Sequence, residues 1–419
     1  MLIVAETAVH AGAYPGLQPR LMVPQALASR MDLAAELECG TYQRKVPVEN
    51  IIAELQASGL QGRGGAGFAA GVKWATLAQS KKEHKVVIAN GEEGEPASGK
   101  DQWLLNHRPH LVLDGLLLAA QAVGATRTIV YLSHAATVQS MRAAIAELEA
   151  SVHKPAIPVE VHVVPRSYVA GEESAVCRAI NGGQAKPTAK PPRPFERGVD
   201  DAPTLVSNVE TLAHAAWISR NGAQAFRAEG TEQSPGTILV TLTGACHRPG
   251  VYEVPLGLTL DTVFEAVGGG YSAQPKAFIV GGWFGGMLAA EHSKRNCCYA
   301  GLRQVGSGLG CAAITVLGQD ANVMEVAGDI GMWYTRESAQ QCGTCIRGTQ
   351  AIAGALVRIN LGAGEHQDRE NLIRWGNTLP GRGACAFLDG AAALARTVVH
   401  EFDADLRQCL SKSASKSKQ

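Results

Sequence analysis

The feature that most constrains this chain is a cluster of four glycines within six residues, Gly62-Arg63-Gly64-Gly65-Ala66-Gly67, followed by Lys73. Glycines leave backbone N–H groups unobstructed by Cβ atoms, and Arg63 and Lys73 add positive charge, so the cluster predicts an anion cradle. The spacing G-x-G-x-x-G is present, but the apolar residues at 46–55 follow helical rather than strand spacing, which excludes the ordinary dinucleotide-binding motif. A plain flexible turn is the alternative.

Two acidic turns follow predicted strands. The apolar run 85–89 leads into Asn90-Gly91-Glu92-Glu93-Gly94-Glu95-Pro96, and the predicted strand 159–164 leads into Tyr168-Val169-Ala170-Gly171-Glu172-Glu173-Ser174. Because open α/β sheets bind ligands beyond the carboxyl ends of their strands, we expect both turns to converge on one crevice. For the second turn the alternative is a pair of solvated carboxylates, which are favoured in a first helical turn.

The order of predicted elements indicates the fold class. Predicted helices at 68–77, 110–123 and 135–148 alternate with strands at 85–89, 127–132 and 159–164. This alternation predicts a mainly parallel α/β domain over residues 1–235, with an irregular lead-in at 1–45 that packs on it. Short predicted strands and a helix at 259–267 favour a small β-grasp-like domain at 236–322. Residues 323–408 predict a helical bundle, and 409–419 a disordered basic tail.

Composition narrows the function classes. Lys+Arg and Asp+Glu both number 38, so overall charge does not suggest a nucleic-acid groove or an anionic membrane surface. The most apolar helical segment, 111–123, is too short to span a bilayer. The N-terminus lacks the pattern of a signal peptide. We therefore expect a cytoplasmic protein with reduced cysteines, held at the inner face of a membrane, if at all, through partners.

Several runs of the sequence resemble one family. In order between residues 48 and 402 they are GLQGRGGAGF, GVKW, NGEEGEP, KDQW, YVAGEESAV, AKPPRP, SNVETLA, GVYEVPLGLTL, CGTC and GRGACAFLDGAAA. Together they are similar to the flavin- and NADH-binding subunit of respiratory complex I and of related soluble hydrogenases and formate dehydrogenases. The resemblance implies FMN, NADH and an iron–sulfur cluster. It also implies that the middle domain is ubiquitin-like, of the SLBB type, and that the helical domain is of the iron–sulfur type.

The resemblance further implies site residues. Flavin contacts are implied for Gly62, Arg63, Gly64, Lys73, Asn90, Glu92, Tyr168, Gly171, Glu172, Glu173 and Asn208. Glu95 and Lys190 match positions that hold the nicotinamide nucleotide, and Phe68 matches one that stacks on adenine. Arg193 replaces an aromatic residue, and because a guanidinium can stack on adenine and pair with a 2′-phosphate, it predicts better tolerance of NADPH than in relatives. Glu95 and Glu172 are the candidate catalytic residues.

The cysteines predict a metal site whose type the spacing leaves open. Cys342 and Cys345 form a C-x-x-C pair in the helical region, and Cys385 follows forty residues after the second. From the residues alone the pair fits a redox dithiol, half a zinc site or part of a cluster. The resemblance implies iron–sulfur, normally C-x-x-C-x-x-C with a distant fourth cysteine. Gly348 stands at the third position of that run, so we expect the usual four-cysteine 4Fe-4S cluster to be incomplete.

These observations predict a flavoprotein oxidoreductase subunit that passes electrons from NAD(P)H through FMN to an iron–sulfur centre or a protein partner. The flavin supplies the conversion from two-electron to one-electron transfer. The expected partner is an iron–sulfur or ferredoxin-like protein within a multisubunit complex. One alternative exchanges electrons with a ferredoxin-like partner without using NADH, and another is a non-catalytic assembly subunit.

Overall fold

The first sheet of the protein consists of four parallel strands in the order β4–β3–β2–β5. The computed structural model describes residues 10–416, and side chains as far as residue 411. The strands are β2 (Val86–Asn90), β3 (Arg127–Leu132), β4 (Val159–Val163) and β5 (Thr204–Asn208). In β2, Val87 and Ala89 face one hydrophobic core and Val86 and Ile88 face another, because successive strand residues point to opposite faces. Both faces of this sheet are therefore covered.

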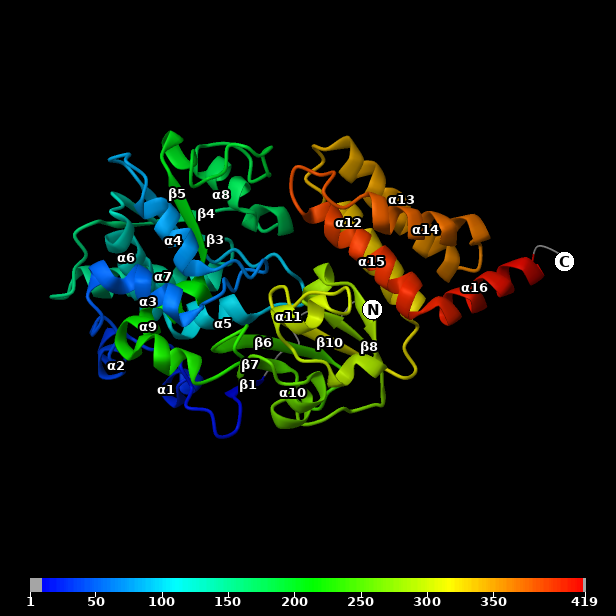
Figure 1. Ribbon diagram of the computed structural model, residues 1–419, viewed down its shortest axis with the longest axis horizontal. Helices are drawn as coiled ribbons and strands as arrows, with labels where there is room; N and C mark the ends of the chain where they lie inside the picture. Colours follow the sequence, from blue (N-terminus) through cyan, green and yellow to red (C-terminus); the bar gives the residue numbers. More distant parts are fainter. Residues whose placement is uncertain (1–9, 417–419) are drawn as a thin grey trace.

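Helices form the two covering layers (Figure 1). One core joins the sheet to helices α3 (Ile51–Ser58), α4 (Ala70–Ala78), α5 (Lys100–His107), α6 (Pro109–Val123), α7 (Ala135–Glu149) and α9 (Val209–Arg227). The short helices α1 (Pro24–Ala28) and α2 (Leu33–Glu38) belong to the same side. Helix α8 (Glu173–Ile180) packs on the opposite face.

The strand order creates a switch point for ligand binding. The chain runs from β2 to β3 to β4 in one direction, and β5 then returns to the other side of β2. Asn90 and Asn208, the last residues of β2 and β5, lie opposite each other in register. Open α/β sheets bind ligands in the crevice beyond the carboxyl ends of the strands at such a point.

A second, mixed sheet has the order β1–β7–β6–β10–β8–β9. Its strands are β1 (His10–Ala13), β6 (Thr237–Gly244), β7 (Gly250–Pro255), β8 (Pro275–Val280), β9 (Met287–Ala289) and β10 (Ala313–Gly318). In β8, Phe278 and Val280 face a core shared with helix α10 (Leu260–Ala266), whereas Ala277 and Ile279 face the C-terminal helices. The finer β-grasp assignment stays a prediction.

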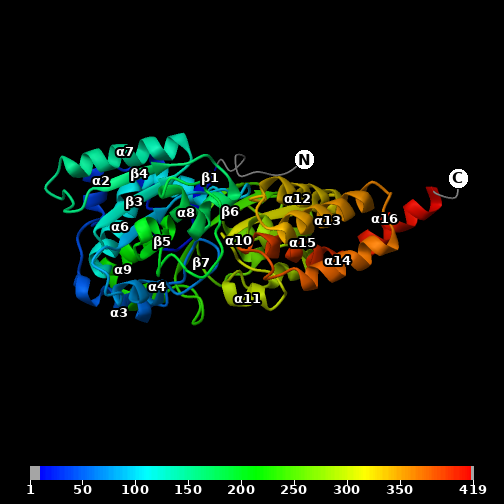
Figure 2. The same cartoon turned by 90° about the horizontal axis from the view of Figure 1, so that it is seen from above.

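The C-terminal helices pack against that second face. They are α12 (Val323–Glu337), α13 (Gly343–Asn360), α14 (His366–Thr378), α15 (Phe387–Glu401) and α16 (Asp403–Lys416). Figure 2 shows the α/β layer and the helical part following one another along the long axis, with α16 projecting beyond the other helices. Among the described residues, no helix is both long and apolar enough to cross a bilayer.

The predicted α/β class with C-terminal helices is confirmed, but three expectations need correction. Part of the lead-in, β1, pairs with β7 in the second sheet instead of packing on the first domain. Strand β5 was not predicted from the sequence. The predicted disordered tail 409–419 is helical as far as Lys416, where α16 ends. Residues 1–9 and 417–419 lie outside the described part, and the domain boundaries near 235 and 322 stay predictions.

Candidate functional site

The glycine loop lies over the switch point of the first sheet. Gly62 N donates to Phe68 O at 2.8 Å and closes the loop. Gly65 and Gly67 have φ values of 118° and 65°, a left-handed region that favours glycine. A Cβ on the exposed Gly64 would lie 3.1 Å from Asn208 Cβ, at the end of β5. The loop therefore places exposed backbone where the fold predicts a ligand, and α4 begins directly after it.

The side chain of Arg63 does not line this loop. Its guanidinium is fully buried and donates to Gln61 O at 2.8 Å and to Thr237 O of β6 at 2.9 Å. Its Nε lies 3.9 Å from Glu210 Oε1. The expectation that Arg63 adds free positive charge to the cradle is thus wrong. The residue instead fastens the loop to the second sheet.

Four charged side chains connect α4, α8 and the proline-rich loop at residues 182–203. Lys73 Nζ and Lys190 Nζ each lie 3.3 Å from a different oxygen of Glu173. Lys190 also pairs with Glu172, which caps α8 by accepting a hydrogen bond from Ser174 N at 2.9 Å. Burial raises the pKa of Glu173, but the two lysines outweigh it and hold that pKa below its usual range. Glu172 thus has the helix-start role of the alternative interpretation and an ion pair as well.

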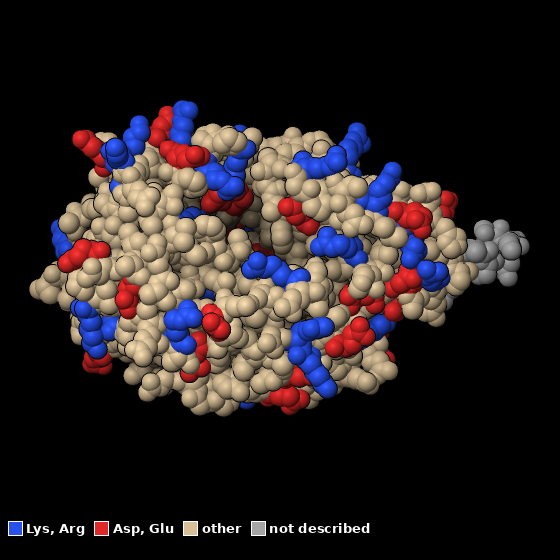
Figure 3. All heavy atoms as spheres, in the orientation of Figure 1, with Lys and Arg blue, Asp and Glu red and all other residues tan. Residues whose placement is uncertain are grey.

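The first acidic turn is more deeply buried. Glu92 and Glu95 are 7% and 6% exposed, and burial raises the pKa of each to about 7. A Cβ on Gly282 would lie 2.3 Å from Glu95 Cδ, so the second domain closes over this carboxyl group. Asn90 Nδ2 donates to Gly171 O at 2.9 Å and joins the two acidic turns, which do converge as predicted. Figure 3 shows a hollow between the α/β domain and the helical bundle with acidic side chains in its wall.

A buried chain of polar groups extends from the predicted residue Asn208, and its other members, Lys100, Asp101 and Glu210, were not predicted from the sequence. Asn208 Nδ2 donates to Asp101 Oδ2 at 2.7 Å, and Lys100 Nζ lies 2.6 Å from Asp101 Oδ1 and 2.8 Å from Glu210 Oε2. Burial opposes ionisation of Glu210, but Lys100 outweighs it and lowers the pKa to about 2. The signal was present in the runs KDQW and SNVETLA, which contain these residues.

Tyr299 supports the same loop from the second domain. It begins the short helix α11 (Tyr299–Arg303), and its hydroxyl donates to Gly62 O at 2.9 Å. A Cβ on Gly67 would lie 2.8 Å from Tyr299 Cδ1, so the ring presses on the loop backbone. No pattern in the sequence distinguishes this tyrosine from others.

Phe68 and Arg193, the two residues expected to contact the adenine side of the nucleotide, are exposed. The side chain of Phe68 is 58% exposed and has no ring partner among residues 10–411. Arg193 is exposed, and its backbone N donates to Glu196 Oε2 at 2.7 Å. The structure does not pair Phe68 with Arg193, so a shared adenine site stays a prediction.

The three predicted cysteine ligands line one small pocket. Cys342 directly precedes α13, Cys345 lies in the first turn of that helix, and Cys385 shortly precedes α15. The pocket is lined by Val169, Pro187, Ser338, Ala339, Gln341, Cys342, Cys345, Gly383, Ala384, Cys385 and Phe387. Burial raises the pKa of Cys345 and of Cys385. The thiols therefore favour the protonated form until a metal displaces the protons.

Gly348 does not face this pocket, which corrects its predicted role as the vacant ligand position. A Cβ there would lie 2.9 Å from Leu388 Cδ1 and 3.1 Å from Leu379 Cδ1, so the position belongs to the packing of the helices. Ala339 lines the pocket instead. It precedes Cys342 by the same three residues that separate Cys342 from Cys345.

The spacing of the three thiols suits a cluster better than a single ion. Zinc with bonds of about 2.3 Å in a tetrahedron holds its sulfurs about 3.8 Å apart. Within the described residues, Glu291, His292 and Glu401 are the group whose three ligand atoms all lie within 4.8 Å of one another, and the three cysteines do not meet that condition. Their wider separation fits a group with several irons, each held by one thiolate.

The cysteine pocket adjoins the second acidic turn. Val169 lines the pocket, and the neighbouring Tyr168 places its ring 5.0 Å from that of Trp333 and 5.4 Å from that of Phe387. Tyr168 N donates to Glu337 Oε2 of α12 at 3.1 Å. One short segment therefore links the candidate flavin site to the candidate cluster site.

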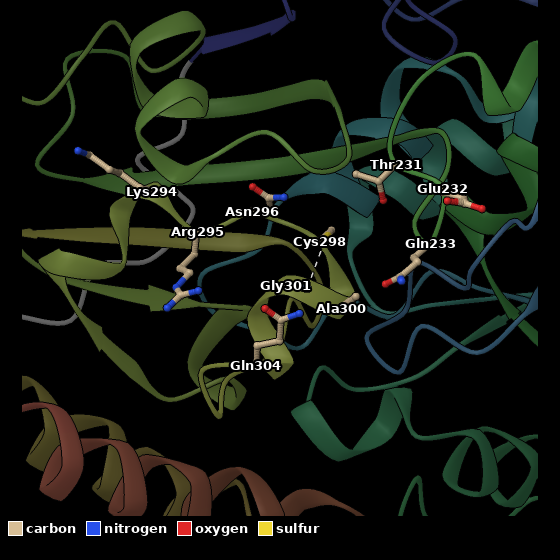
Figure 4. A pocket seen from close by; sticks show the side chains of 10 residues that line it. All are labelled: Thr231, Glu232, Gln233, Lys294, Arg295, Asn296, Cys298, Ala300, Gly301 and Gln304. Carbon is tan, nitrogen blue, oxygen red and sulfur yellow. Dashed lines mark hydrogen bonds between the residues drawn. The ribbon is translucent and has the colours of Figure 1, made fainter.

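A larger pocket of about 400 Å³ lies elsewhere, between residues 231–233 and 294–304 (Figure 4). Figure 4 shows Glu232 and Gln233 on one side of it and Gln304 on the other. The buried thiol of Cys298 accepts a hydrogen bond from Gly301 N at its wall. None of the residues predicted to bind flavin, nucleotide or metal lines this pocket.

Comparison with known proteins agrees with both sites. The Nuo51 FMN-binding domain matches residues 55–217, and the NADH-ubiquinone oxidoreductase-F iron-sulfur binding region matches residues 325–409. The crystal structure of an NAD+-reducing NiFe-hydrogenase in the air-oxidized state superimposes with a TM-score of 0.84 at 28% identity. The match covers 94% of this chain and 67% of that chain.

Curated relatives match over most of their length. The F subunit of NADH-quinone oxidoreductase from Mycobacterium tuberculosis is 32% identical over 373 residues, which cover 85% of this chain and 84% of the relative. An F subunit of the same enzyme from Rhizobium meliloti is 32% identical over 369 residues, which cover 85% of this chain and 88% of the relative. The glycine loop, the acidic turns and the cysteine pocket all lie within the matched regions, and the chain belongs to the family of NADH-quinone oxidoreductase F subunits.

Proposed function

We propose that this chain transfers electrons from a reduced nicotinamide nucleotide through FMN at the glycine loop to an iron–sulfur centre at the cysteine pocket. The observation that carries the proposal is the segment Tyr168–Val169, because it links the second acidic turn to the pocket lined by all three candidate ligands. With both groups bound, this segment would give a covalent and packed connection between them. Bound FMN supplies the chemistry of accepting a hydride and releasing electrons singly.

The residues around the glycine loop hold the flavin in this proposal. The backbone of Gly62 and Gly64 accommodates the phosphate, since neither presents a Cβ, and Asn208 lies directly against Gly64. Asn90 and Gly171 are already joined by a hydrogen bond, which fixes the two turns relative to each other. Lys73 and Glu173 form an ion pair at the edge of the same crevice.

The buried carboxyl groups of Glu92 and Glu95 bind and release protons in this proposal. With pKa values of about 7, Glu92 and Glu95 can hold or release a proton near neutral pH. Glu172 pairs with Lys190 and orients the lysine toward the nucleotide. Phe68 would stack on the adenine, and Arg193 would stack on it or pair with a 2′-phosphate, which would give better tolerance of NADPH.

The matched proteins support a place for this chain in a larger assembly. The solved structure that this chain matches is an NAD+-reducing hydrogenase, and the curated relatives are subunits of a quinone oxidoreductase. We propose that this chain likewise delivers electrons to an iron–sulfur subunit of a larger assembly.

Two measurements test the proposal. Purified protein should be yellow and should release FMN on denaturation. Stopped-flow absorbance should show flavin reduction by NADH, and the rate ratio of NADH to NADPH should rise in Arg193→Phe. If the protein refuses added FMN, the flavoprotein assignment is wrong. If it holds FMN that neither nucleotide reduces but a reduced ferredoxin does, the alternative without NADH replaces the one proposed here.

A further inference from the structure

The cysteine pocket offers three cysteine ligands, one fewer than a 4Fe-4S cluster normally has. Iron–sulfur cubanes are normally held by four cysteine thiolates, one for each iron. Three of the pocket's side chains are cysteines, and Ala339 lies on the wall with them, three residues before Cys342. A methyl group cannot bind iron.

The polar neighbours of Ala339 are already engaged. Ser338 Oγ lies 3.5 Å from Cys345 Sγ and 3.4 Å from Gln340 N, which donates to it. Gln341 Nε2 donates to Pro187 O at 2.7 Å, and its Oε1 accepts from Arg178 Nη1 at 2.8 Å. The remaining lining residues are Val, Pro, Gly, Ala and Phe, whose side chains offer no ligand atom.

We propose that the site holds a 4Fe-4S cluster by three thiolates, with the iron nearest Ala339 left to bind water or hydroxide. The inference rests on the proposed cluster at this pocket and goes further by assigning the open corner to one position. An iron without a protein ligand is exposed to exchange and oxidation, so it should be the first iron lost. A thiolate introduced at residue 339 should retain it.

The test uses the full chain and two matched cysteine substitutions. Wild type, Ala339→Cys and Gly348→Cys are each reconstituted anaerobically with ferrous iron and sulfide, and iron, sulfide and FMN are measured per chain. Gly348→Cys is the control, because it adds a thiol near the site but on the side filled by Leu388 and Leu379. The clash there involves the ends of flexible side chains, which can shift.

We expect wild type and Gly348→Cys to fall from about four irons toward about three in air, with EPR of the oxidised protein showing the three-iron form. Ala339→Cys should keep four irons at least about ten times longer. Cys385→Ser in the wild-type background leaves two of the three thiolates and should lose most of the iron.

Several outcomes would overturn the inference. Wild type could keep four irons in air as long as Ala339→Cys does, or Gly348→Cys could be the protected variant. After exposure to air, Ala339→Cys could also hold no more iron than wild type. Absence of iron from all reconstituted variants that still bind FMN would refute both this inference and the proposed cluster. A protected cluster in Ala339→Cys without bound FMN would support this inference while the flavin proposal fails.

Discussion

The glycine loop and the cysteine pocket differ in how completely protein contacts build each site. Around the loop, Tyr299 holds Gly62 from the second domain, and Asn208 continues into the buried Asp101–Lys100–Glu210 chain. Around the pocket, three thiols lie apart, and their fourth neighbour is Ala339. The loop is fixed by hydrogen bonds and ion pairs within the chain, whereas the three thiols of the pocket are not joined to one another by any such contact among the described residues.

This difference predicts that substitutions at the loop change ligand affinity and that substitutions at the pocket change metal content. A pre-organised loop binds its ligand without a large cost of ordering. A substitution that changes the shape of the loop therefore reduces ligand affinity directly. In a metal-dependent pocket, protons compete with the metal for the ligands. Such a pocket therefore loses its metal before the fold is lost. The predictions below test the pre-organised side, from the largest expected effect to the smallest.

The largest effect is expected from Gly64→Asp. The new Cβ would lie 3.1 Å from Asn208 Cβ, and the carboxylate would occupy the cradle proposed for the phosphate. We expect a loss of FMN affinity of about a thousandfold, which corresponds to about 4 kcal/mol. Titration of apoprotein with FMN, followed by quenching of flavin fluorescence, measures it.

Gly308→Asp is the control for that substitution. A Cβ at Gly308 meets no atom within 4 Å, and this glycine lies outside the loop. Its affinity for FMN should equal that of wild type. Equal losses in the two variants would show that added negative charge, rather than the cradle, explains the result.

Glu95→Gln should change the pH dependence of stability. Burial raises the pKa of Glu95 to about 7 in the folded protein, from 4.5 as its ordinary value. Between these values the folded state holds the proton and the unfolded state does not, so stability falls as pH rises toward 7. Glutamine removes this loss, and we expect apoprotein at pH 8 to gain at most about 3 kcal/mol, with little change at pH 4.5.

Thermal or urea unfolding of apoprotein at the two pH values checks this. Glu291→Gln is the control, since that side chain is 80% exposed. A gain that is the same at both pH values would mean that Glu95 is ionised in the folded state throughout, and the proton-holding role proposed for it would be wrong.

The sequence predicted the regular elements well and the cross-domain contacts poorly. Strand Arg127–Leu132 begins and ends where expected, because it is a continuous run of strand-forming residues bounded by turns. Strand Thr204–Asn208 was not predicted, because it is short, follows the proline-rich loop and leads directly into a helix. Local pattern could not reveal that β1 pairs with a strand far along the chain.

The candidate site shows the same division. The convergence of Asn90 and Gly171 follows from the position of both acidic turns after strands, which the sequence indicated, whereas Asn208 was implied by the resemblance alone. The burial of Arg63 does not follow from the sequence, because its side chain turns toward Glu210 and Thr237, which only the fold brings near. Spacing alone also allowed the cysteine run to be extended to Gly348, whereas packing by Leu388 excludes that position and leaves Ala339.

Tyr299→Phe tests whether the second domain holds the loop. The substitution removes the hydroxyl that donates to Gly62 O at 2.9 Å and keeps the ring that presses on Gly67. A buried hydrogen bond contributes about 1 kcal/mol, so FMN should bind about fivefold more weakly. Tyr271→Phe, which removes a hydrogen bond to Asp261, is the control and should leave FMN affinity unchanged. If the two variants behave alike, the contact is structural and does not position the loop.

The smallest effect is expected from Phe68→Ala, and it concerns the nucleotide rather than the flavin. The ring is 58% exposed and has no aromatic partner among residues 10–411, so its loss costs little packing and leaves the glycine loop, closed by the backbone of the same residue, in place. An exposed stacking contact lies at the low end of about 0.5–1.5 kcal/mol, which predicts a rise in the KM for NADH of about two- to threefold with kcat and FMN content unchanged. Steady-state kinetics with an artificial electron acceptor measures it, and Leu361→Ala, a substitution of a 68% exposed apolar residue in the helical part, is the control. A fall in FMN content in Phe68→Ala would place the ring against the flavin, and the division between a flavin crevice and a separate adenine site would then have to be redrawn.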